Sequence, residues 1–332
     1  NHMFRNRYFW LLISLFFVLK TEAKVTLTSI WGDNMVLQQQ AEVTFRGKAT
    51  PGKRVYASAS WNHRKIYADC DRNGQWTLAL PTPEAGGPYT ITFSDGEELT
   101  LKNILIGEVW FCSGQSNMEM PMGGFDRQPV RGTNDIIAKA KPSTPIRMYT
   151  TDSKDGRWVR QFSKTPVEDC QGEWLENTPV NVSHISAVSY YFARYIQEVL
   201  EVPVGIVVST WGGSKIEAWM SRESIKPFSS IDLSILDNDA EVKNPTATPC
   251  VLYNGKIAPL TNFAVRGFLW YQGESNRDNA DLYQSLMPAF VADLRAKWGR
   301  GELPFYFVQI APFKYNEEGA NYLREQQART AL

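Results

Sequence analysis

Histidine and cysteine are scarce in this chain of 332 residues, which has three histidines and four cysteines. The cysteines, Cys70, Cys112, Cys170 and Cys250, show no Cys-x-x-Cys spacing. Such spacing is typical of zinc sites, so its absence argues against one. The spacing does not assign disulfides either, and pairing and buried free thiols both stay open.

An excess of charge of one sign is also missing. The chain carries 35 basic and 35 acidic residues, a formal net charge of +0, without a long basic block. This balance argues against nucleic acid or an anionic membrane surface as the main partner. The hydrophobic fraction of 43% and the charged fraction of 21% are typical of a soluble globular protein, and the length allows more than one core.

The apolar run near the N-terminus is short. Arg5 and Arg7 form a positive segment, residues 11–19 are apolar, and a small residue, Ala23, follows. This pattern predicts a signal peptide over residues 3–23 that is cleaved after Ala23. The run is short for a bilayer, although a retained anchor is the alternative. We therefore expect a secreted or periplasmic protein with no membrane association after cleavage.

Residues 24–103 alternate between short strand-like segments and turns. Pro-Gly, Asn-Gly and Asp-Gly pairs punctuate the segment. The pieces rich in β-branched and aromatic residues are 25–28, 43–45, 55–57 and 89–93. This organisation predicts a small antiparallel β-sandwich domain without a catalytic site of its own.

From Ile104 the pattern becomes that of an α/β domain, which we assign to residues 104–332. Buried strands are expected at 104–111 and 305–310, and helices at 186–200, 282–298 and from 322 onward. The alternation predicts a parallel sheet with flanking helices. In the first helix the apolar residues at helical spacing are Val188, Tyr191, Phe192, Tyr195 and Val199.

Three expected strands end in the same kind of polar tip. Residues 112–118 read CSGQSNM, residues 209–214 read STWGGS, and residues 272–276 read QGESN. Ser116 can act as a nucleophile at the end of its strand, or it can cap the helix that follows. The G-x-S-x-G elbow is not present. Together such tips can supply donors to one oxyanion.

The runs at 107–118 (GEVWFCSGQSNM) and 270–276 (WYQGESN) resemble those of the sialate O-acetylesterase family, which are SGNH-type carbohydrate esterases. The resemblance covers nearly the whole chain after the first two dozen residues, with further similar runs at 33–38, 211–213, 216–220 and 303–305. It implies an SGNH-hydrolase-like domain preceded by a β-domain. It also implies a serine esterase that removes O-acetyl groups from sialic acid or related glycans through an acetyl-serine, without cofactor or metal.

The resemblance assigns roles to particular residues. Ser116 is the expected nucleophile, and Gly213 is the expected backbone donor of the oxyanion hole. SGNH enzymes generally use an asparagine as a further donor, but this chain has Gln-Gly-Glu in that region. We therefore prefer Gln272 to Asn276 for this role.

Three further residues are expected in the loops of the site, namely Gln115, Asn117 and Glu274. Glu274 can orient its loop through an arginine, or it can be a solvated carboxylate. Around these motifs, methionines and tryptophans can line the site or pack in the core. They are Met118, Met120, Met122, Trp110, Trp211, Trp219 and Trp270.

The expected base is missing. The family carries its catalytic Asp and His in an Asp-x-x-His-Pro motif, and this sequence has none. His63 and His184 are poor substitutes, because one falls in the sandwich and the other precedes a helix. We expect that the chain stops before the motif. The alternatives are an acetylxylan or plant-polysaccharide acetylesterase and a glycan-binding pseudoenzyme. The oligomeric state stays open.

Overall fold

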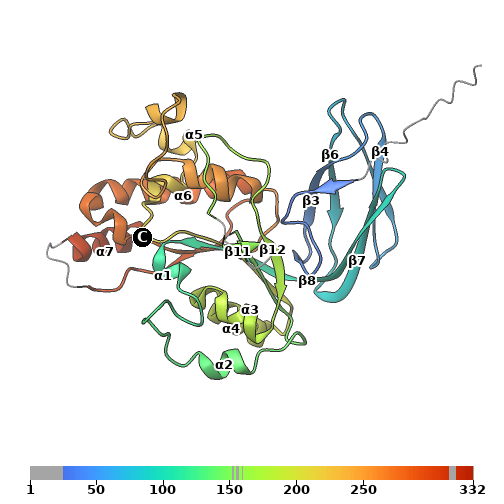
Figure 1. Cartoon of the computed structure of the whole chain (residues 1–332), viewed down its shortest axis with the longest axis horizontal. Coiled ribbons are helices and arrows are strands. Elements are labelled where there is room, and N and C mark those ends of the chain that lie inside the picture. The colour runs from blue at the N-terminus through green and yellow to red at the C-terminus, as the bar shows by residue number, and fades with distance from the viewer. Residues whose placement is uncertain (1–24, 152, 155–156, 159, 314–318, 332) are drawn as a thin grey trace, which may run out of the picture.

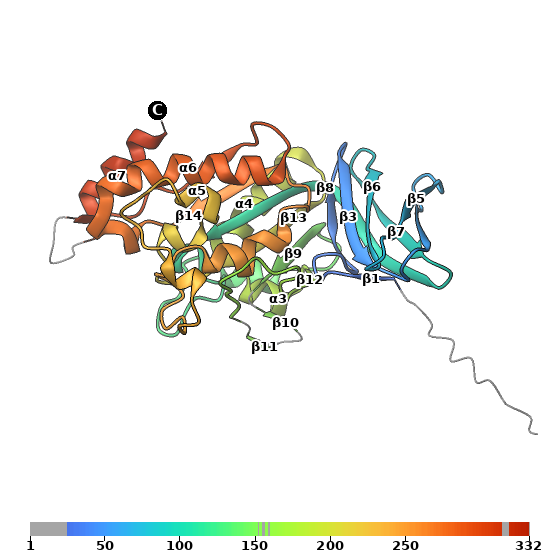
Figure 2. The ribbon, with the colours of Figure 1, turned by 90° about the horizontal axis from the view of Figure 1, so that it is seen from above.

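The computed structural model describes residues 25–151, 153–154, 157–158, 160–313 and 319–331. Two parts of the molecule are joined by one long strand, β8 (Glu98–Gly114), as Figure 1 and Figure 2 show. The start of β8 pairs with β7 (Gly86–Ser94) in a sandwich, and its end lies inside an α/β sheet. The predicted domain boundary after residue 103 falls within this strand. The predicted signal peptide lies outside the described residues.

The N-terminal part consists of two small packed sheets. Alternate residues of β4 point into the core, as a half-buried strand requires. Phe45 and Phe93 meet across the two sheets with ring centroids 5.1 Å apart. One sheet contains β1 (Thr26–Leu27), β3 (Glu42–Lys48) and β6 (Gln75–Pro81); the other contains β2 (Val36–Gln38), β4 (Arg54–Ala59), β5 (Lys65–Asp69), β7 and the start of β8. The predicted small antiparallel β-structure is therefore present.

The second part is built on a mostly parallel sheet. Every residue of β13 is buried, as is typical of parallel strands covered on both faces. The parallel strands, in spatial order, are β9 (Ile146–Thr150), β13 (Val204–Thr210), β8, β14 (Gly267–Tyr271) and β15 (Phe305–Phe307). The antiparallel β12 (Glu173–Glu176) pairs with β9, and β10 (Ser153–Lys154) pairs with β11 (Arg157–Trp158) separately.

Helices cover both faces of this sheet (Figure 1). One face carries α5 (Arg222–Ile225), α6 (Ala280–Trp298) and α7 (Gly319–Thr330); the other carries α1 (Ser116–Glu119), α2 (Asn134–Ala138), α3 (Pro179–His184) and α4 (Ala187–Leu200). Shorter turns are η1 (Ile216–Trp219), η2 (Ser234–Asp237), η3 (Tyr253–Ile257), η4 (Ala258–Leu260) and η5 (Glu274–Asn279). The predicted helices at 186–200 and 282–298 are confirmed, the second ending at Gly299 in a left-handed conformation.

One expectation about burial is wrong, and the apolar residues of α4 do not all mark its buried face. Tyr195 and Val199 of α4 are 67% and 59% exposed, whereas small residues such as Ala193 face the sheet and allow close packing. The strand expected at 305–310 ends at Phe307, and Tyr306 is 56% exposed. Among the described strands β15 pairs only with β14, so it lies at an edge and is less covered.

Candidate active site

Ser116 stands where β8 ends against β14. Gly114 has φ +149°, and a Cβ on it would lie 2.1 Å from the Tyr271 carbonyl oxygen, so only glycine fits. The chain then turns, and the Gln115 N–H donates to the same carbonyl at 3.0 Å. Gln115 occupies the N-cap position of α1, so Ser116 is not the helix cap. Ser116 is half-buried, and its Oγ has no hydrogen-bond partner among the described residues.

The loop after β13 lies beside this serine. A Cβ on Gly212 would lie 3.5 Å from the Ser116 Cβ, so the two backbones are close. Gly213 follows with φ +74° and is exposed. Its N–H has no acceptor within the described part of the chain. The structure therefore brings the predicted nucleophile next to a loop whose backbone N–H is available.

The loop after β14 is tied to the serine loop by Gln115 and Asn117. Gln115 Oε1 accepts from the Gly273 and Ser275 N–H groups, each at 3.2 Å. Asn117 Nδ2 donates to Glu274 Oε1. Glu274 is thus held by an amide on α1, the helix that begins with Ser116. All three predicted loop residues connect the two strand-end loops.

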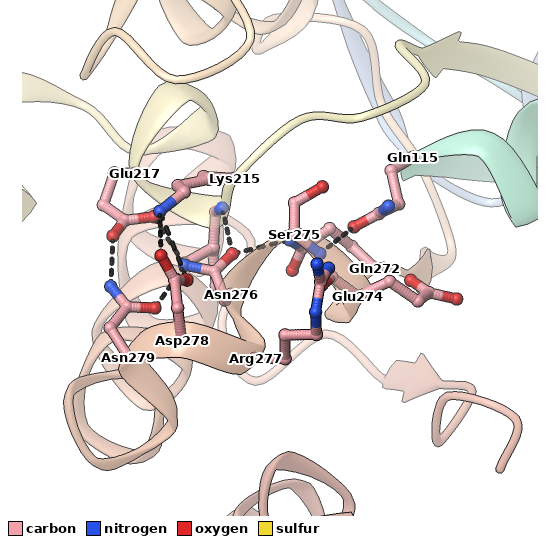
Figure 3. A network of polar contacts seen from close by, with 11 residues as sticks. Gln115, Lys215, Glu217, Gln272, Glu274, Ser275, Asn276, Arg277, Asp278 and Asn279 are labelled. Atoms are coloured by element: carbon pink, nitrogen blue, oxygen red, sulfur yellow. Dashed lines mark hydrogen bonds and ion pairs between the residues drawn. The ribbon is translucent and has the colours of Figure 1, made fainter. Parts of the chain in front are cut away.

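Gln272 and Asn276 are both fully buried, and their amides are engaged inside the protein (Figure 3). Gln272 Nε2 donates to the Ser214 carbonyl at 3.0 Å and to Asn276 Oδ1 at 2.7 Å. Asn276 Nδ2 donates to Glu217 Oε2 at 2.8 Å. Neither amide hydrogen-bonds to Ser116 in the described structure. Their assignment to an oxyanion hole stays a prediction.

Two charged residues that the sequence did not point out contact the serine loop. Glu119 accepts from the Gly212 N–H and pairs with Arg160. Glu119 stands three residues after Ser116, so helical periodicity offered a signal for its position. Arg160 comes from a distant segment, and no local pattern could have placed it there.

Aromatic and sulfur-containing residues near the motifs divide into core and surface. Trp211 is half-buried beside the site and meets Phe162, 40% exposed, at a ring-centroid distance of 6.1 Å. The other tryptophans of the motifs and two of the methionines are in the core, with exposed fractions of 5% or less: Trp110, Trp219, Trp270, Met118 and Met122. The four cysteines are buried free thiols.

No histidine contacts Ser116 among the described residues. His63 is exposed in a turn of the sandwich with φ +55°, and His184 is exposed at the end of α3. Within the same residues, no group of three or more His, Cys, Asp or Glu side chains could hold a metal ion. None of the helices described is both long and apolar enough to cross a membrane.

The fold and this edge of the sheet define an α/β protein with a serine-centred site. The model of a carbohydrate esterase family, described as sialic acid-specific acetylesterase, matches residues 106–332. The chain belongs to this family of carboxylic ester hydrolases.

Individual relatives agree with this assignment. Human sialate O-acetylesterase is 30% identical over 302 residues, covering 84% of this chain and 56% of the relative. The mouse sialate O-acetylesterase is 28% identical and covers the same share of this chain and 59% of the relative. The chain thus spans little more than half the length of these relatives. A carbohydrate acetylesterase from Xanthomonas citri is 32% identical with a TM-score of 0.80, over 93% of this chain and 66% of that structure.

Proposed function

We propose that this protein is an exported serine esterase of SGNH type that removes O-acetyl groups from sialic acid or a related acetylated glycan. One observation carries the proposal: the partly exposed Ser116 Oγ has no hydrogen-bond partner among the described residues and lies beside the glycine loop after β13. Membership of a carbohydrate esterase family supports the acetylated glycan as substrate.

In the proposed reaction, Ser116 Oγ attacks the acetyl carbonyl carbon while a base takes its proton. The carbonyl oxygen becomes negative and accepts a hydrogen bond from the Gly213 N–H, which carries no other acceptor in the described structure. The acyl–oxygen bond to the sugar breaks, and the sugar oxygen takes up a proton. Water then attacks the acetyl-serine and releases acetate.

Among the described residues no histidine contacts Ser116, so the proposal names no proton acceptor there. A serine hydroxyl without a base is a weak nucleophile at neutral pH. Donors and binding still accelerate a reaction when members of a triad are missing. We therefore expect this chain alone to hydrolyse a chromogenic acetate ester only at a residual, Ser116-dependent rate.

A partly exposed aromatic pair beside the site supports a sugar substrate. Phe162 and Trp211 lie next to the loop that approaches Ser116. Aromatic rings offer an apolar face together with low conformational entropy, which suits the apolar face of a pyranose. This surface does not by itself distinguish sialic acid from xylose.

A covalent test separates catalysis from binding. A fluorophosphonate transfers its phosphonyl group to a serine hydroxyl with loss of fluoride and of the hydroxyl proton, and the mass increase is mapped by peptide mass spectrometry. We expect slow labelling at Ser116, because the described residues give it no base, none there in Ser116→Ala, and unchanged labelling in Ser275→Ala. Ser275 is a matched control because it occupies the equivalent place after β14 and is also partly exposed.

The outcomes also decide between the substrates. Faster release of acetate from O-acetylated sialic acid than from acetylated xylan supports the proposal, and the reverse order makes the protein a plant-polysaccharide esterase. Glycan binding without any Ser116-dependent labelling would make it a pseudoenzyme.

Export is part of the proposal and has its own test. The signal-like segment at residues 3–23 motivates it. N-terminal sequencing of the exported protein should begin at Lys24. A mature protein that retains the apolar segment would contradict cleavage after Ala23.

A further inference from the structure

Glu119 lies on the same short helix as Ser116 and is nearly enclosed. Its side chain is 8% exposed. One carboxylate oxygen, Oε2, accepts from the Gly212 N–H, and the other, Oε1, pairs with Arg160 Nη2. A buried carboxylate needs such charge-assisted partners. Glu119 therefore connects the nucleophile's helix directly to the loop after β13.

Arg160 also contacts the same loop. Its Nη1 donates to the Thr210 carbonyl at 3.3 Å, and its guanidinium lies 4.9 Å from the centre of the Trp211 ring. The Thr210 carbonyl also accepts from the buried Lys256 Nζ at 2.9 Å. The strand end before Gly212 is thus fixed by side chains from two other segments of the chain.

The loop approaches the serine closely at Gly212. A Cβ on Gly212 would lie 3.1 Å from Glu119 Oε2 and 3.5 Å from the Ser116 Cβ. In the proposed function, the N–H of the next residue, Gly213, donates a hydrogen bond to the oxyanion. A shift of Gly212 relative to α1 therefore changes the distance between Ser116 Oγ and that N–H.

We propose that Glu119, supported by Arg160, is a positioning residue that sets the oxyanion loop against the nucleophile. The inference rests on the proposed function of Ser116 and Gly213. Glu119 does not touch the substrate in this scheme, because its two oxygens are occupied by Gly212 and Arg160. Glu119 affects the reaction only by fixing the position of the loop after β13 relative to Ser116.

Glu119→Gln tests this role with little change in size. A glutamine keeps one oxygen acceptor, so it cannot serve both Gly212 and Arg160. We expect the maximal rate of Ser116 phosphonylation to fall about 10- to 100-fold, because small misplacements of reacting groups cost this much. The concentration for half-maximal labelling should change by less than about 2-fold, since the probe's binding contacts remain.

Two further variants refine the test. Arg160→Lys keeps the charge but loses the planar fork, so an intermediate fall in rate is expected. Glu223→Gln is the matched control. Glu223 is an exposed carboxylate on α5 that pairs with Lys297 of α6, so losing this ion pair should leave the labelling of Ser116 unchanged.

Amide hydrogen exchange provides a readout that does not depend on the reaction. Exchange in the segment 211–213 should become faster in Glu119→Gln and stay unchanged in Glu223→Gln. The inference is overturned if Glu119→Gln labels at the unsubstituted rate, or if exchange rises uniformly over the chain, which indicates general destabilisation. A chain whose Ser116 is never labelled overturns the proposed function and this inference together, whereas normal Ser116 labelling in Glu119→Gln overturns this inference alone.

Discussion

The loops after β8 and β14 have similar sequences but opposite uses. Each places a glycine, a serine and an asparagine just beyond a buried strand. After β8, Ser116 is partly exposed and its Oγ has no partner in the described structure. After β14, Asn276 is fully buried, and its amide group makes hydrogen bonds on both sides. The serines of both loops are partly exposed, but only the second loop buries its asparagine, which supports the site from within the protein.

The difference follows from the cost of burying polar groups. A buried amide must find partners for its donors and its acceptor, and Asn276 finds them in Ile216, Glu217 and Gln272. Once paired, such a group is fixed and costly to disturb. A partly exposed hydroxyl can exchange water for a substrate instead. Similar strand-end motifs therefore do not imply similar roles.

The largest expected effect comes from pushing the two loops apart. Gly114→Ala places a methyl group 2.1 Å from the Tyr271 carbonyl oxygen at a backbone φ of +149°. We expect a loss of about 3 kcal/mol or more in the free energy of unfolding. Urea unfolding measures it, with Gly52→Ala as control because Gly52 also has a positive φ but no atom within 4 Å. Equal losses in the two variants would show that contact with Tyr271 is unimportant.

A second change removes the support behind the site. Asn276→Ala leaves the Ile216 N–H and Glu217 Oε2 each without this partner. We expect a loss of about 2–3 kcal/mol in the free energy of unfolding. Asn262→Ala is the control, since the Asn262 amide donates a partly buried hydrogen bond at 3.2 Å to a backbone carbonyl. An equally small cost for both would mean that the network after β14 is not a buried scaffold.

The third prediction concerns Gly213, in the exposed loop beside Ser116. Gly213→Ala introduces a side chain at φ +74° where no atom lies within 4 Å. We expect a loss of about 1 kcal/mol in the free energy of unfolding, from backbone strain alone. Gly301→Ala has a similar φ of +77° and open surroundings, so it should cost the same. Only Gly213→Ala should slow phosphonylation of Ser116; equal labelling in both variants would remove Gly213 from the oxyanion hole.

The smallest effect contrasts Ser116 with Cys112, four residues earlier and fully buried. Burial raises the pKa of the Cys112 thiol to about 12, against 9.0 for an ordinary thiol. Between pH 8 and 10 Cys112 in the folded chain should therefore show no rise in its slow reaction with a thiol reagent, and unfolding should expose four thiols.

The same pKa shift has a consequence for stability. Because the pKa is higher in the folded chain, the neutral Cys112 contributes stability that is complete below pH 9 and is lost as the pH rises through about 12. Stoichiometric reaction of Cys112 at pH 8 in the folded chain would contradict its burial.

The sequence predicted some elements of the sheet and helices closely. Helices were predicted at 186–200 from periodicity and at 282–298 from a terminal glycine, and the structure has them at 187–200 and 280–298. The small β-domain was predicted from its turns. The buried face of α4 was not, because Tyr195 and Val199 are apolar but exposed while Ala193 faces the sheet. Local hydrophobicity does not report which face a neighbouring strand will cover.

For the site, the sequence by itself predicted Ser116 as the nucleophile and the loops around it. Ser116 and the glycines at 114 and 213 stand in short local motifs, whose backbone demands are written in consecutive residues. Only the tertiary structure decided that the amides of Gln272 and Asn276 point into the protein, and that Arg160 joins Glu119 beside Gly212. These contacts join segments between 41 and 93 residues apart, or depend on which groups are buried. Tertiary packing decides both which distant segments meet and which groups are buried, and no local sequence pattern encodes either.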